Sequence, residues 1–165
     1  MMERALGETT TRARGNVSDL SAWLEVVPAE TIRNRPRLSL NASRIFYLLG
    51  RFEQAEECIR NTEALLKALP PDADTEHMLA GAALYYGSIA SVRGESHKAI
   101  ELTRYAQERI ADHHHLLHAR ANFTLGLAHE VAEQSTAAVA YYLQSSKQAT
   151  TAGVLFLAVH AFGAA

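Results

Sequence analysis

Four histidines close together in the sequence are the residues whose type and spacing could best bind a metal ion. They are His113, His114, His115 and His118. On a helix, His114 and His118 would share a face, because residues four apart are neighbours there, and imidazole nitrogens are good zinc ligands. No cysteine or carboxylate completes an obvious ligand set, and the cluster falls at a junction between predicted hairpins, where polar residues are ordinary. We therefore expect no metal site, with His114 and His118 as the pair to test.

Acidic side chains that could act as general acids or bases occur without an accompanying catalytic motif. They are Glu56, Glu57, Glu63, Glu76 and Glu130, all at predicted helix positions where a solvated charge is usual. The sequence has no nucleophile elbow, no cysteine–histidine motif, no metalloprotease motif and no G-x-x-x-x-G-K-[ST] phosphate loop. It thus predicts that this chain is not an enzyme and that it binds no cofactor.

Composition is that of a folded protein without a strong charge. The chain has 165 residues, 48% of them hydrophobic, with 16 basic and 18 acidic residues and a net charge of −2. That balance lacks the positive excess of a nucleic-acid-binding surface. The single cysteine, Cys58, cannot form an internal disulfide, and we expect it to be a small buried thiol. No apolar run near the start suits a signal peptide or a membrane span, so we expect a soluble, cytoplasmic protein.

Apolar residues recur at helical spacing along most of the chain and predict an all-α protein. Pro28 and Pro36 bracket a short connector, and Pro36 suits the first turn of a helix. Asp72, Asp74 and Thr75 offer capping oxygens for another helix start. We expect a flexible start over residues 1–14 and a single helical-repeat domain over 15–165. Its hairpins cover about 36–69, 75–111 and 115–150, and an unpaired helix covers 153–165.

The three hairpins share small residues around their turns, at steps of 44 and 39 residues. The turn positions are Gly50, Gly94 and Glu133, the small residues seven positions earlier are Ser43, Gly87 and Gly126, and the alanines five positions later are Ala55, Ala99 and Ala138. Such periods are typical of helical-hairpin repeats. Glycine inside a helix costs about 1 kcal/mol relative to alanine, so Gly87 and Gly126 indicate close helix packing. The third turn lacks a glycine, which predicts an altered turn rather than a broken repeat.

The terminal helix is apolar and has no partner helix in the sequence, beginning after Gly153 with Val154-Leu155-Phe156-Leu157-Ala158-Val159. Repeat arrays normally end on a helix with a polar outer face. We therefore expect that the chain is a piece of a longer protein and that the isolated piece self-associates through this helix.

The repeat positions resemble those of the tetratricopeptide family, and further motifs resemble one group of proteins within it. Trp23-Leu24-Glu25-Val26-Val27-Pro28, Arg35-Pro36-Arg37-Leu38 and Gly50 with Ala55 are similar to a motif series in the large ATP-binding, LuxR-type (MalT-like) transcriptional regulators. The resemblance covers about residues 15–165. It implies antiparallel helical hairpins stacked in a right-handed superhelix. It also implies an effector- or partner-binding sensor segment, which signals to ATPase and DNA-binding modules absent from this chain. ATP is expected only for the absent module.

The resemblance also implies that the first helix of each hairpin lines a concave binding face. The residues that would bind there are Arg37, Leu40, Arg44, Tyr47, Leu84, Tyr85, Ser88, Arg120, Phe123, Leu127 and Glu130. Arginine forks suit carboxylates or phosphates, and aromatic rings suit apolar surfaces. In the pairs Tyr85-Tyr86 and Tyr141-Tyr142, one ring must face the interior. The ligand would be a small effector or a protein partner, and the alternative function is a free-standing adaptor for protein–protein interaction.

Overall fold

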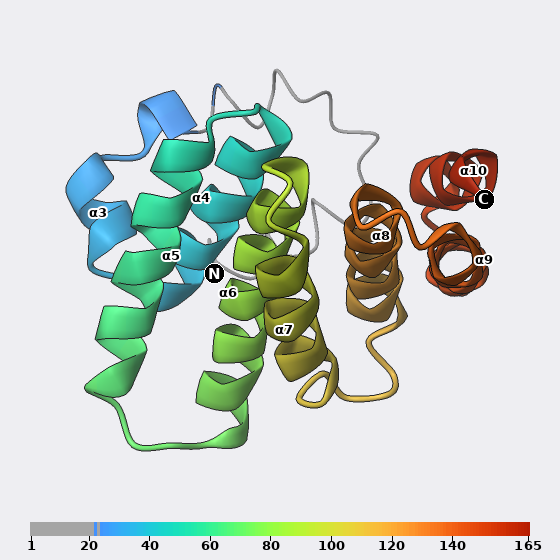
Figure 1. The fold of residues 1–165 in the computed structure, drawn as a ribbon. Coiled ribbons are helices and arrows are strands. Elements are labelled where there is room, and N and C mark those ends of the chain that lie inside the picture. The colour runs from blue at the N-terminus through green and yellow to red at the C-terminus, as the bar shows by residue number, and fades with distance from the viewer. Residues whose placement is uncertain (1–21, 23) are drawn as a thin grey trace. The chain divides into compact units, whose positions relative to one another are not determined.

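The computed structural model describes residue 22 and residues 24–165, and every regular element in that part of the chain is an α-helix. The helices are α3 (Ala29–Arg33), α4 (Pro36–Leu48), α5 (Phe52–Lys67), α6 (Ala73–Val92), α7 (Ser96–Gln107), α8 (His115–Val131), α9 (Ser135–Thr151) and α10 (Leu155–Ala164) (Figure 1). The predicted all-α class is confirmed. The expected flexible start and Trp23 lie outside the described residues. None of the described helices is both long and apolar enough to cross a membrane.

The chain divides into two compact units, one ending at Tyr85 and the other beginning at Tyr86, so the boundary falls inside α6. In the first unit α5 packs along α4, and the short α3 packs on both. In the second unit α8 packs between α7 and α9, and α10 packs on α9 (Figure 1).

Four tight turns have the same left-handed backbone. Gly50, Gly94, Glu133 and Gly153 have φ angles of 70°, 80°, 58° and 72°. After each of them, the next amide donates a hydrogen bond to the carbonyl five residues back, as from Arg51 N to Phe46 O and from Gln134 N to His129 O, both at 2.8 Å. This bonding satisfies carbonyls at the helix end. The expected alteration of the third turn is wrong: Glu133 adopts the same backbone conformation as the glycines, and this turn differs from the others only in its residue type.

Helix starts follow the sequence signals in two places and depart from them in one. Pro36 is the first residue of α4, as predicted. Asp72 caps α6, because its Oδ1 accepts a hydrogen bond from Thr75 N at 2.7 Å; that bond lowers the pKa of the Asp72 carboxyl. The predicted connector between Pro28 and Pro36 contains α3 instead. With only five residues, α3 is too short for apolar periodicity to indicate it.

Small residues allow the helices of the second unit to pack closely. A Cβ on Gly87 would lie 2.5 Å from Thr103 Oγ1, and one on Gly126 would lie 2.5 Å from two ring atoms of Tyr142. Ala99 and Ala138, on the facing helices α7 and α9, are buried. The neighbouring side chains therefore leave no room for a Cβ at Gly87 or Gly126. In the first unit, Ala55 and Ser43 are fully buried at the corresponding positions.

Buried polar side chains also join the helices of the second unit. Asn122 on α8 accepts a hydrogen bond from Gln107 of α7 at 3.0 Å and donates one to Gln148 of α9 at 2.6 Å. Ser145 Oγ donates to the Ala119 carbonyl at 2.7 Å. A buried polar group that is hydrogen-bonded avoids the cost of desolvation, so these bonds fix the register of α8 against its neighbours.

Candidate functional site

A hollow of about 410 Å³ opens between α3, α4 and α5 in the first unit. It is lined by Leu24, Ala29, Ile32, Arg33, Ser39, Phe46, Gln54, Glu57, Cys58, Arg60 and Asn61. Its volume is in the range of small-molecule sites, which are typically about 300–1,000 Å³. Four of the eleven lining residues are apolar, and the other seven bring polar or charged groups or, at Cys58, a thiol.

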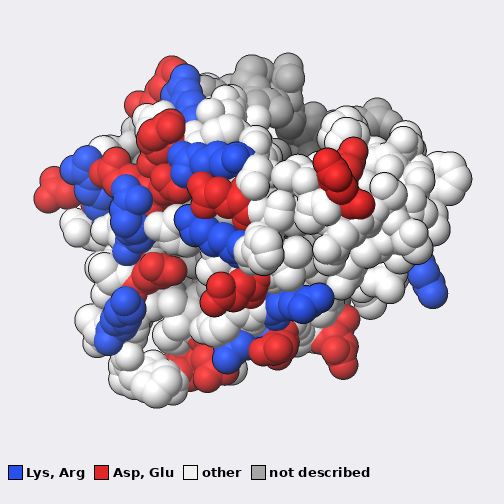
Figure 2. Space-filling model, in the orientation of Figure 1, with Lys and Arg blue, Asp and Glu red and all other residues white. Residues whose placement is uncertain are grey.

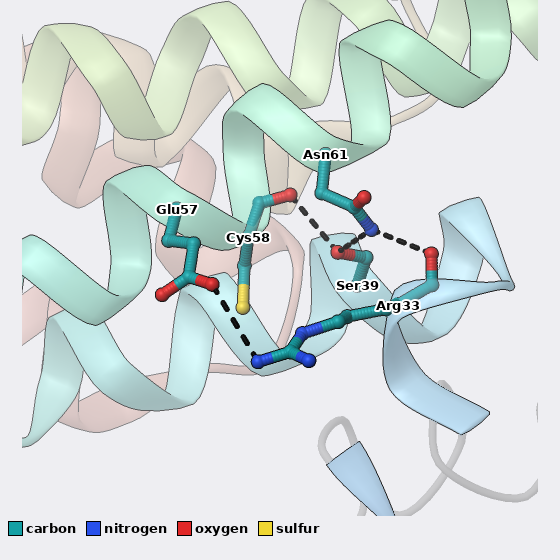
Figure 3. A network of polar contacts seen from close by, with 5 residues as sticks. All are labelled: Arg33, Ser39, Glu57, Cys58 and Asn61. Atoms are coloured by element: carbon teal, nitrogen blue, oxygen red, sulfur yellow. Dashed lines mark hydrogen bonds and ion pairs between the residues drawn. The ribbon is translucent and has the colours of Figure 1, made fainter. Parts of the chain in front are cut away.

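A polar network holds the three helices together at this hollow (Figure 3). Asn61 of α5 donates from Nδ2 to the Arg33 carbonyl at 2.6 Å and to Ser39 Oγ at 3.2 Å. Ser39 of α4 donates in turn to the Cys58 carbonyl at 2.9 Å. Because Arg33 is the last residue of α3, Asn61 supplies a donor to a helix-end carbonyl that has no partner inside its own helix. The network therefore fixes α3, and the hollow beneath it, against α4 and α5.

Cys58 brings a thiol to the hollow beside a pair of opposite charges. Arg33 and Glu57 approach to 3.8 Å, and the Cys58 sulfur lies beside them (Figure 3). Burial is the main cause that raises the pKa of Cys58 to about 11; the negative charge of Glu57 adds to it, while a hydrogen bond with Ser39 and the charge of Arg33 oppose it. The thiol is therefore protonated at neutral pH and is a poor nucleophile.

The charged residues that line the hollow give it a small positive excess. Arg33 and Arg60 contribute two positive charges, and Glu57 contributes one negative charge. The Arg33–Glu57 pair is long and both side chains are more than 60% exposed, so the two charges neutralise each other weakly. No ion pair of Arg60 is found among the described residues. An anionic group would be attracted to this part of the hollow.

A second hollow, of about 620 Å³, lies in the second unit beside two helix turns. Its lining is Gly94, Glu95, Ser96, His97, Lys98, Ile100, Ala132 and Gln134. Lys98 Nζ donates a hydrogen bond to Glu95 Oε2 at 2.9 Å, so the positive and negative charges on the wall of this hollow are paired with each other. Its apolar side chains are only those of Ile100 and Ala132, so this hollow offers less apolar contact to a ligand than the first.

Three residues of the predicted concave face are buried. Leu84, Tyr85 and Ser88 expose 0%, 7% and 6% of their surface, and Ser88 Oγ bonds Thr124 Oγ1 at 2.8 Å. A ligand could contact these side chains only after the helices separate. Tyr85 and Tyr142 are the buried members of their pairs, as the helical period predicts.

Four of the other eight members of the predicted face make contacts with residues of their own unit. Arg37 is ion-paired with Asp74. The Tyr47 ring lies 6.0 Å from that of Phe52 and 6.4 Å from that of Tyr85. In the second unit, the Phe123 ring lies 5.5 Å from that of Tyr142, and Glu130 accepts a hydrogen bond from the Tyr142 hydroxyl at 2.5 Å. The half-buried members are Leu40, Arg44, Tyr47, Arg120, Phe123 and Leu127. A role of the whole set in binding stays a prediction.

The histidine cluster lies just before and within the first turn of α8. His113 and His114 have ring centroids 4.1 Å apart, and His118 is half-buried. In the part of the chain that the structure describes, no three or more His, Cys, Asp or Glu side chains come together to hold a metal ion.

Sequence reasoning did not assign Arg33, Ser39, Asn61 and Arg60 to a common site. Asn61 carried the clearest signal, because asparagine is a poor helix former and here lies inside a helix, next to the buried Thr62. Cys58 is half-buried rather than a fully buried core thiol, and desolvation still dominates its pKa. These residues form one wall of the hollow because the short helix α3 packs on α4 and α5. Apolar periodicity did not indicate α3.

The chain matches no protein-family model, no curated protein and no solved structure.

Proposed function

We propose that this chain is a non-enzymatic binding segment whose small effector occupies the hollow between α3, α4 and α5. The observation that carries this proposal is the combination of an apolar wall with a rigidly held polar wall in a hollow of about 410 Å³. The effector is a small organic anion with an apolar body. Its anionic group lies near Arg33 and Arg60, and its body packs on Leu24, Ile32 and Phe46.

The chemistry of the lining supports binding rather than catalysis. The protonated Cys58 thiol is a poor nucleophile, and Glu57 is ion-paired with Arg33. No histidine lines this hollow. The groups that remain can bind and orient a ligand.

The wider role is that of the sensor segment of a LuxR-type regulator. Helices joined by repeated left-handed turns, with small residues between them, support this role as the kind of architecture that offers a binding surface without a catalytic centre. We propose that the helical pairs belong to a tetratricopeptide-like superhelix. An effector that binds one arrangement of the helices more tightly shifts the population toward it, and this shift is the signal to the partner modules.

Protection of Cys58 tests the effector site directly. Cys58 is the only cysteine of the chain, so alkylation by N-ethylmaleimide at about pH 9 reports on this hollow alone. Members of a panel of aliphatic and aromatic carboxylates should slow the reaction several-fold and give saturable protection. Arg60→Gln should weaken that protection, whereas Arg109→Gln, which changes an arginine of the second unit, should leave it unchanged.

Two results would contradict the effector site. One is a panel in which no anion protects Cys58 at millimolar concentration. The other is equal protection of wild type and of Ile32→Trp, a substitution that fills the hollow with a larger side chain.

The mass of the endogenous protein tests the wider role. An antibody against this segment should detect a product several times larger than 18.1 kDa if the segment belongs to a multidomain regulator. A product near 18.1 kDa would remove that proposal and leave the adaptor function, for which recovery of a protein partner is the next experiment.

A further inference from the structure

The buried residues of helix α10 are small, and four of its five large apolar residues are exposed; the fifth, Leu157, is half-buried against a cluster that includes Ala158. Ala158 and Ala161 are buried against the neighbouring helices. Leu155, Phe156, Val159 and Phe162 are 71%, 84%, 71% and 68% exposed. A surface helix normally shows the reverse distribution, with its large apolar side chains toward the core. An exposed apolar face of this kind marks an interaction surface.

The position of this face is fixed by the repeated turn. Gly153 has the same left-handed backbone as the turns after α4, α6 and α8, and Ala158 lies five residues later, like Ala55 and Ala99 in their hairpins. Ser146 Oγ of α9 donates to the Ala158 carbonyl at 2.9 Å. These contacts determine which side of α10 meets α9, and the four exposed apolar side chains point away from that side.

The charge on the face suits a second copy of the same face. The ten residues of α10 include no Asp, Glu, Lys or Arg, and the surface over α10 is white in Figure 2, whereas both signs of charge crowd the surface of the first unit in that view. In a twofold interface each patch meets its own copy, so any charged residue near the axis faces a like charge. The one ionisable side chain in α10 is His160, whose ring stacks on that of Phe156 with centroids 6.0 Å apart, so no Asp, Glu, Lys or Arg of this helix would meet its own copy.

We propose that α10 is a dimerisation element, and that two copies of the chain pair α10 against α10 about a twofold axis. Four large side chains that are two-thirds or more exposed offer on the order of 500 Å² per copy. A standard stable interface buries about 800 Å² per partner. The dimer is therefore weak and exists in a concentration-dependent equilibrium with the monomer.

Sedimentation velocity over a concentration series tests this proposal. The wild-type chain should shift from monomer to dimer between low micromolar and near-millimolar concentration. Phe156→Glu and Phe162→Glu should stay monomeric with an unchanged far-ultraviolet circular dichroism spectrum. Val131→Glu, which places the same charge at a half-exposed apolar position of α8, is the control and should dimerise like wild type.

Cysteine cross-linking tests the twofold arrangement separately. In a Cys58→Ser background, one cysteine at a time replaces Phe156, Val159 or Phe162. A residue near a twofold axis lies close to its own copy, so at least one variant should form a disulfide-linked dimer under mild oxidation, while Ser135→Cys on α9 should not.

Three outcomes would overturn the proposal. A wild-type chain that stays monomeric at every concentration removes the dimer. A dimer that survives Phe156→Glu and Phe162→Glu moves the interface away from α10. A dimer lost in those variants, but without a disulfide in any of the three cysteine variants, excludes the twofold pairing.

Discussion

Replacing Gly126 with alanine should destabilise the protein, although alanine is the better helix former. A Cβ at this position would lie 2.5 Å from Cδ1 and Cε1 of Tyr142, which is closer than carbon atoms approach without a shift. The ring cannot move away easily, because Tyr142 is 1% exposed, its hydroxyl donates to Glu130 and its ring contacts Phe123.

The size of the effect follows from two opposing terms. Alanine in place of glycine inside a helix stabilises by about 1 kcal/mol. Overpacking a core costs about 1–3 kcal/mol, and a contact this short belongs in the upper part of that range. The free energy of unfolding of Gly126→Ala should therefore fall by about 1–2 kcal/mol.

Urea unfolding followed by circular dichroism at 222 nm measures this difference. Gly81→Ala is the matched control, because Gly81 is also a buried helix glycine, but its Cβ would meet only the flexible end of Leu40, at 3.2 Å. It should be at least as stable as wild type, because the helix-propensity gain of about 1 kcal/mol is opposed only by a contact with a flexible side chain. In a Tyr142→Ala background the clash is absent, and Gly126→Ala should become stabilising.

Two results would refute this reasoning. The first is a Gly126→Ala variant as stable as wild type. The second is an equal loss in the presence and absence of the Tyr142 ring, which would show that the ring is not the cause.

Three further predictions concern the turns, a helix cap and the thiol. Glu133→Gly should raise the free energy of unfolding by about 1 kcal/mol, and Gly94→Ala should lower it by a similar amount, because only glycine adopts a left-handed backbone without cost; urea unfolding that shows no change in either variant would contradict this. Asp72→Ala should lower the melting temperature at neutral pH. The lowered pKa of Asp72 means that its contribution is present above the pKa of an unfolded aspartate and is lost as pH falls through the folded value, so the two melting curves should converge on acidification; a difference that stays constant down to pH 2 would exclude the cap. With its pKa raised to about 11, Cys58 should react with iodoacetamide at about pH 8 at least tenfold more slowly in the folded chain than in urea; equal rates would show that burial does not control the thiol.

The helices could be predicted from the sequence because their signals are local. Apolar periodicity, Pro36, the Asp72 cap and the glycines at the turns each act within a few residues of the chain. Even the turn without a glycine was predictable, since Ala138 kept its place five residues after Glu133. Close packing at Gly87 and Gly126 was also predictable, because glycine destabilises a helix interior and is expected there mainly where a neighbouring helix leaves no room for a side chain.

The candidate site was not predictable in the same way. Arg33 and Asn61 are 28 residues apart, and nothing local says that Asn61 Nδ2 donates to the Arg33 carbonyl. Likewise, helical period could not show that Tyr47, Phe123 and Glu130 would be used in contacts within their own units rather than left open to a ligand. The predicted binding residues were selected because they share a helix face. Whether that face is exposed to a ligand depends on how the neighbouring helices pack.

The sequence by itself determined the helices, their turns and the positions where the helices approach most closely, because backbone conformation and small side chains act locally. Only the tertiary structure decided that Arg33, Ser39, Cys58 and Asn61 share a wall, and that α10 turns Phe156 and Phe162 outward. The physical reason is that the burial of a side chain and its hydrogen-bond partners depend on two helices at once, and these can be far apart in the sequence. Which side chains are buried, and which hydrogen bonds they make, is therefore settled only when the helices pack against one another.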